Sequence, residues 1–149
     1  MVQLICLLLF LNDFTIFDAT AQEQHKSGFY YVTEQDFDTE TSMRSNGYVY
    51  KINEFVIGLD DVEKVRRIKS KIRPYHQIEF IFTPEGAKKW EAQTEKYANK
   101  KLGFIHNGKL LETVTVMEKI SSGKCSLGFL EVTDFDALYQ DLKKSVEKK

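Results

Sequence analysis

Residues 77–97 read QIEFIFTPEGAKKWEAQTEKY and carry the clearest secondary-structure signals of the chain. Its first six residues carry apolar side chains at every second position, which is the period of a β-strand. The residues of that apolar face are Ile78, Phe80 and Phe82. Thr83 then precedes Pro84, a pair that predicts a helix start, because proline in the first helical position loses no hydrogen bond. The sequence therefore predicts a strand followed at once by a helix.

The predicted helix has one inward face. Its members, spaced three or four residues apart, are Ala87, Trp90, Thr94 and Tyr97. Charged side chains fill the opposite face, as in a helix that packs on a core and faces water on its other side. At this spacing, and opposite an apolar strand, Trp90 is expected in the core. The alternative is that its ring stacks on a ligand.

A hairpin and a last helix are predicted further along the chain. Strands at 102–106 and 109–117 flank Asn107-Gly108, a pair that favours a type I′ turn. A further strand is expected at 125–132. Thr133 is expected to cap the last helix. The apolar positions of that helix are Phe135, Leu138, Leu142 and Val146.

The upstream part is predicted to contain two strands and another helix. The strands are expected at 29–32 and 48–52, with a long surface loop at 33–45. Asp60 is a suitable cap for a helix that Pro74 would end. The apolar positions of this predicted helix are Val62, Val65, Ile68 and Ile72.

These elements define an α+β fold, with a mainly antiparallel sheet and helices packed on one face. The 149 residues are the length of one domain. The chain holds 21 basic and 22 acidic residues, a balance that gives no sign of nucleic-acid binding.

The N-terminal sequence predicts export. Residues 4–11 (LICLLLFL) form an apolar run too short for a membrane span, which needs about 20 residues, but suited to a signal-peptide core. Ala19-Thr20-Ala21 fits cleavage before Gln22. The alternative is that the run is a buried first strand or helix. The expected organisation is a signal peptide at 1–21, a polar tether at 22–27 and one α+β domain at 28–149, exported to the periplasm or cell envelope without a transmembrane segment in the mature chain.

The sequence contains no recognisable catalytic or metal-binding motif. The three histidines, His25, His76 and His106, lie far apart and fit no metal-ligand spacing. His106 directly precedes a turn, so we expect it to be exposed rather than catalytic. No catalytic, cofactor-binding or metal-binding residue is predicted, and no cofactor is expected.

Two groups could nevertheless support catalysis. Cys125 with a distant histidine could form a nucleophile pair, but its place in an alternating strand favours a small core residue. Glu79 and Glu112 could act as paired carboxylates, but strand alternation points both outward. The enzyme alternative is therefore a small envelope hydrolase or modifying enzyme that uses Cys125 or a carboxylate pair.

From Ile78 onward the chain resembles the head subdomain of the large periplasmic domain of SecD and SecDF, auxiliary subunits of the bacterial protein translocase. The family's helix pattern is matched by Thr83, Glu85, Gly86, Ala87, Lys89, Trp90 and Thr94. Its hairpin pattern is matched by Lys100, Leu102, Ile105, Gly108 and Lys109, and its last strand by Ile120, Gly123, Gly128 and Phe129. The resemblance extends over residues 28–148. The chain also resembles small exported proteins of the Bacteroidetes type that carry this subdomain alone.

Three positions depart from the family pattern. Asn99 and Asn107 stand where the family has Gly and Asp, and Asn tolerates left-handed turn backbone almost as well. Val114 replaces a frequent proline, which leaves the strand at 109–117 more able to pair. SecD proteins surround this subdomain with transmembrane helices, so the resemblance implies the fold and the compartment but not translocase activity.

The resemblance implies a non-enzymatic, translocation-related binding module that contacts polypeptide or an envelope protein. A related possibility is an accessory subunit with one dedicated partner. Addition of a strand to an exposed sheet edge would give affinity that tolerates different sequences. The candidate edge is the strand at 109–117; the alternative is that this strand lies inside the sheet.

Overall fold

The computed structural model describes residues 25–69, 76–129 and 133–148. This part of the chain forms strands, two α-helices and a short 3₁₀ helix. The strands are β1 (Gly28–Gln35), β2 (Ser42–Ser45), β3 (Tyr48–Gly58), β4 (Val62–Lys69), β5 (His76–Phe82), β6 (Lys101–His106), β7 (Lys109–Thr115) and β8 (Lys124–Phe129). The helices are η1 (Leu59–Asp61), α1 (Pro84–Lys96) and α2 (Phe135–Glu147).

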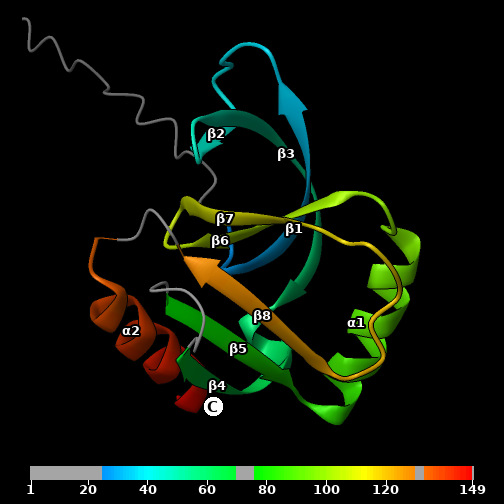
Figure 1. Ribbon diagram of the computed structural model, residues 1–149, viewed down its shortest axis with the longest axis vertical. Helices are drawn as coiled ribbons and strands as arrows, with labels where there is room; N and C mark the ends of the chain where they lie inside the picture. The colour runs from blue at the N-terminus through cyan, green and yellow to red at the C-terminus, as the bar shows by residue number, and fades with distance from the viewer. Residues whose placement is uncertain (1–24, 70–75, 130–132, 149) are drawn as a thin grey trace, which may run out of the picture.

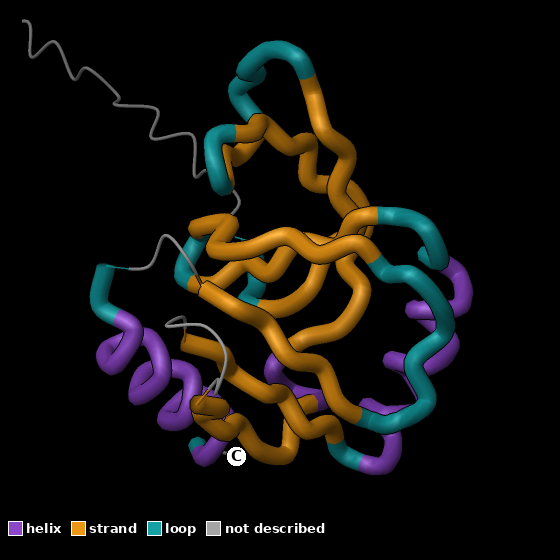
Figure 2. The backbone as a smooth tube through the Cα atoms, in the orientation of Figure 1, coloured by secondary structure: helices purple, strands orange, loops and turns teal. Residues whose placement is uncertain are grey.

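The strands form two sheets in which every pairing is antiparallel (Figure 1). The larger sheet has the order β2-β3-β1-β6-β7, and the smaller has the order β4-β5-β8. α1 contacts β3, β5 and η1, whereas α2 contacts β4 and η1. Figure 2 shows the loop between β1 and β2 projecting away from both helices. The predicted α+β class with antiparallel pairing is confirmed, and the structure adds the division into two sheets.

The helix predicted from Asp60 is wrong, because this segment is the strand β4, preceded by the single 3₁₀ turn η1. A β-bulge between Val62 and Lys64 inserts one extra residue opposite β5. Val62 therefore pairs with Phe82 and Val65 with Phe80, so two residues three apart share the buried face. The bulge thus imitates helical spacing in a strand. The predicted positions Ile72 and Pro74 lie outside the described residues.

α1 and the β6–β7 hairpin form as predicted. The Thr83 hydroxyl accepts a hydrogen bond from the Gly86 N–H at 3.0 Å, which caps the first turn behind Pro84. The hairpin turn consists of Asn107 and Gly108, with φ of 49° and 74°. Both values are positive, as a type I′ turn requires.

Three smaller predictions need correction or cannot be compared. The region 33–45 is not one loop, because β1 continues to Gln35 and β2 occupies Ser42–Ser45. Asp134, not Thr133, caps α2, since its side chain accepts from the Ala137 N–H at 3.0 Å. Within the strand predicted at 125–132, residues 130–132 lie outside the described part, as does the whole predicted signal peptide.

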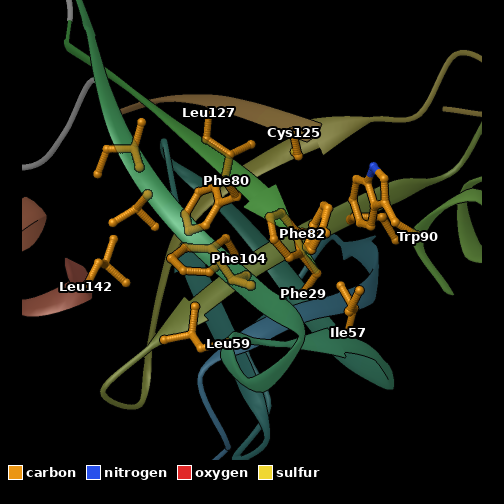
Figure 3. Close-up of a cluster of buried hydrophobic side chains, with 14 of the residues drawn as sticks. Phe29, Ile57, Leu59, Phe80, Phe82, Trp90, Phe104, Cys125, Leu127 and Leu142 are labelled. Atoms are coloured by element: carbon orange, nitrogen blue, oxygen red, sulfur yellow. The ribbon is translucent and has the colours of Figure 1, made fainter. Parts of the chain in front are cut away.

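The core lies where the two sheets face each other. Phe29 of β1 has its ring centroid 5.6 Å from Phe80 of β5 and 5.1 Å from Phe104 of β6. Trp90 of α1 closes one end of this cluster, 5.1 Å from Phe29 and 5.1 Å from Phe82. Figure 3 shows these rings gathered between strands of both sheets. Aromatic packing therefore joins the two sheets and α1.

Candidate functional site

The groups considered for catalysis are not arranged as a catalytic site. Cys125 is buried in β8, and burial raises the pKa of its thiol to about 12, so the nucleophilic thiolate is disfavoured. Glu79 lies in the smaller sheet, where its carboxylate accepts from the Arg66 Nε at 2.8 Å. Glu112 lies in the larger sheet. Glu79 and Glu112 therefore lie in different sheets and bind different partners, Arg66 and Asn46.

His106 is buried, which corrects the expectation that it is exposed; only 5% of the residue is accessible. Its Nδ1 lies 2.9 Å from the Ser27 hydroxyl and its Nε2 lies 2.6 Å from the Asp141 carboxylate. Both contacts are satisfied when Nε2 donates to Asp141 and Nδ1 accepts from Ser27. The chain of hydrogen bonds joins the start of β1, the end of β6 and α2.

This Ser–His–Asp chain resembles a hydrolase relay only in composition. In such a relay the carboxylate is buried behind the imidazole. Here half of the Asp141 side chain is exposed while the His106 ring is buried. We therefore interpret the cluster as a structural connection. Sequence reasoning missed it because its three members lie in three separate elements.

We expect acid to weaken this connection. The hydrogen bond from His106 lowers the pKa of Asp141 below its usual value near 4. Because the folded-state pKa is the lower one, the stabilisation is present above about pH 4 and is lost as the pH falls through the folded-state pKa. In urea denaturation from about pH 5 to pH 3, Asp141→Asn should flatten the dependence of unfolding free energy on pH. An unchanged slope would contradict this role.

β7 lies at an end of the larger sheet, so of the two alternatives for residues 109–117 the structure selects the edge strand. The Val116 N–H donates to the Lys100 carbonyl at 2.9 Å. Hydrogen bonding alternates along an antiparallel strand, so the main-chain N–H and C=O of Thr115 are turned away from β6. Thr115 is also exposed. The end of β7 around Thr115 thus offers main-chain groups to another strand.

The first half of β7 is partly covered, because β2, the other end of the same sheet, approaches it. Glu112 is buried here, contrary to the expectation that it points outward. Its Oε1 accepts from the Asn46 Nδ2 at 2.8 Å and from the Thr113 N–H at 2.9 Å. The Glu112 carboxylate therefore already accepts the hydrogen bond from the outward N–H of Thr113. The accessible edge of β7 begins after Thr113.

β8 is a second sheet edge and lies beside β7. It ends the smaller sheet, whose other edge, β4, contacts α2. The Phe82 N–H donates to the Gly123 carbonyl at 3.0 Å, so by the same alternation the main-chain groups of exposed Ser126 point away from β5. No pattern in the sequence indicated that a second edge would lie near the first, because each strand belongs to a different sheet.

A pocket of about 370 Å³ lies between these two edges. Residues 114–118 and 124–126 form its walls, and Trp90 and Cys125 contribute to its apolar lining. The Nε1 of Trp90 is buried and makes no hydrogen bond within the described residues. In Figure 3 this nitrogen lies on the side of the ring away from Ile57. Trp90 is thus a core residue, as predicted, that also borders a pocket.

The described residues give no indication of a metal site or a membrane span. Within 25–69, 76–129 and 133–148, no three His, Cys, Asp or Glu side chains are grouped as metal ligands. None of the helices in these ranges is long and apolar enough to cross a bilayer.

Comparison with known proteins connects the fold to SecDF. No family model matches the sequence, and no curated protein matches it. A crystal structure of SecDF in the super-membrane-facing form aligns with a TM-score of 0.51 and 23% identity, over 55% of this chain and 11% of that one. A structure of the membrane component SecDF that enhances protein export aligns with a TM-score of 0.60 and 13% identity, over 83% of this chain and 63% of that one.

A third structure, SecDF from Thermus thermophilus, aligns with a TM-score of 0.51 and 21% identity, over 66% of this chain and 14% of that one. The chain thus spans less than two thirds of each SecDF chain. The protein is an α+β domain with a SecDF-like fold, and at these identities the likeness concerns the fold alone.

Proposed function

We propose that this protein is a non-enzymatic, translocation-related binding module that holds polypeptide in an extended conformation. One observation carries the proposal: the end of β7 around Thr115 is an exposed sheet edge whose main-chain groups point away from β6. A chain added there would be held by main-chain hydrogen bonds, which tolerate different side chains. The SecDF-like fold supports this function, and we assign the domain to the head-subdomain type on the motifs between Ile78 and Phe129.

We also propose that the protein is exported to the periplasm or cell envelope. The apolar run at 4–11, followed by Ala19-Thr20-Ala21, supports a cleaved signal peptide. N-terminal sequencing of the protein purified from its own host should begin at or near Gln22. A product that retains Met1 would contradict export by this route.

A pair of proline variants tests the strand-addition site. Thr115→Pro removes an N–H that points away from β6, so the fold should persist while binding of an unfolded chain is lost. Val114→Pro removes an N–H that faces β6 and should lower stability sharply. Reduced, carboxymethylated α-lactalbumin is a suitable unfolded probe, with binding measured by fluorescence anisotropy and stability by urea denaturation.

Two controls make the result decisive. Thr113 is a poor target because its N–H already donates to Glu112. Thr115→Val keeps the N–H and should bind the probe as the wild type does. If Thr115→Pro is well folded and its affinity is unchanged, β7 is not the site.

A further inference from the structure

We infer that the bound segment enters between β7 and β8 and hydrogen-bonds to both edges, so that it connects the two sheets; this inference rests on the proposed function. The two strands contact each other, and in Figure 1 they diverge toward the loop that joins them. Each ends its own sheet. The outward main-chain groups of Thr115 and Ser126 both belong to residues that line the intervening pocket.

The pocket between β7 and β8 is already formed in the absence of a partner. The loop that joins the strands is fixed to α1, because the Ile120 N–H donates to the Thr94 hydroxyl oxygen at 2.9 Å. The Thr94 hydroxyl in turn donates to the Trp90 carbonyl at 2.8 Å. At the start of β8, the Gly123 carbonyl is bound by the Phe82 N–H. These bonds hold the pocket walls in place, so little ordering is needed on binding.

The lining indicates which polypeptide segment fits. The accessible apolar lining consists mainly of Met117, Val114 and Ile120. The charged lining residues, Glu118 and Lys124, have opposite signs. The site therefore favours an uncharged segment. Side chains of an extended chain alternate between two faces, so every second residue would meet this surface and should be aliphatic. The two strand edges offer donors and acceptors to the main chain of this segment on opposite sides.

Trp90 supplies a donor that has no acceptor among the described residues. Its Nε1 is buried without a partner in the described residues, a situation that is unfavourable unless something accepts its hydrogen bond. Because this nitrogen is buried, a main-chain carbonyl of the inserted segment reaches it when the Trp90 ring turns toward the pocket, and the hydrogen bond then formed satisfies the donor. Since Trp90 is the chain's single tryptophan, its fluorescence reports directly on occupation of this pocket.

The experiment titrates the protein with a short capped peptide that alternates threonine and valine, and compares three variants with the wild type. Binding should shift the emission of Trp90. Ser126→Pro, which removes an outward N–H of β8, should weaken binding about tenfold, the change expected for one lost hydrogen bond. Trp90→Phe, followed by anisotropy of a labelled peptide, should weaken it to a similar degree. Circular dichroism confirms that each variant is folded.

The outcomes separate this inference from the function on which it rests. Thr115→Pro could abolish binding while folded Ser126→Pro and Trp90→Phe bind as tightly as the wild type. The segment would then pair with β7 alone, and insertion between β7 and β8 would be overturned. If folded Thr115→Pro also binds as the wild type does, the proposed function itself fails. Loss of affinity in all three variants, together with the emission shift in the wild type, supports insertion between the strands.

Discussion

Replacing Trp90 by alanine should lower the free energy of unfolding by roughly 3–5 kcal/mol, the range for truncation of a buried aromatic side chain. Only 1% of the residue is accessible, and its ring packs against Phe29 of the larger sheet and Phe82 of the smaller one. The substitution therefore removes a contact that joins α1 to both sheets. Urea denaturation, followed by circular dichroism, measures the loss.

Two variants on the same helix control for this effect. Trp90→Phe keeps an aromatic ring and should cost less, about 1–2 kcal/mol for the apolar area lost. Lys88→Ala changes an exposed side chain on the same helix. Its free energy of unfolding should stay within about 0.5 kcal/mol of the wild-type value. A loss below about 1 kcal/mol for Trp90→Ala would mean that the ring is not part of the core.

The sequence predicts α1 and the β6–β7 hairpin well, because local signals and burial agree there. Thr83 and Pro84 mark the helix start in the residues that form it, and Asn107-Gly108 provides the turn backbone directly. The inward face of α1 is also predicted correctly, because Trp90 and Tyr97 are buried. Where one short segment contains both the signal and the structure, the prediction needs no distant contact.

β4 could not be predicted from its own residues, because its structure depends on pairing with β5. Val62 and Val65 share a face only because a bulge opposite β5 adds a residue. The sequence alone presents their spacing as helical. The charged residues between and after them, Glu63, Lys64 and Arg66, fit the outer face of a helix.

The candidate site was predictable in part. The absence of proline at Val114 indicated a strand that can pair, and the structure places β7 at the end of its sheet. The burial of Glu112 and the approach of β8 could not be inferred, because both follow from how the sheets curve and face each other. The buried position of His106 likewise depends on Ser27 and Asp141, far away in sequence.

Gly86→Ala should destabilise the protein by about 1–3 kcal/mol, the usual cost of overpacking a tightly packed position. In an ordinary helix the same change stabilises by about 0.5–1 kcal/mol, so the expected sign is reversed. A Cβ on Gly86 would lie 2.3 Å from the Asp61 carbonyl oxygen and 2.9 Å from the Asp61 Cβ. Such contacts force the first turn of α1 and η1 apart.

The cost of Gly86→Ala should arise at this junction and not in α1 itself. The Thr83 N–H donates to the Asp61 carbonyl at 2.9 Å, and Lys89 pairs with the Asp61 carboxylate at 2.7 Å. Separation of α1 from η1 would weaken the hydrogen bond from the Thr83 N–H to the Asp61 carbonyl. Thr83, which caps α1, would then no longer be held against η1. Urea denaturation of Gly86→Ala should therefore show lower stability, whereas Lys88→Ala on the same helix should not. A stability gain for Gly86→Ala would mean that α1 and η1 are not in close contact.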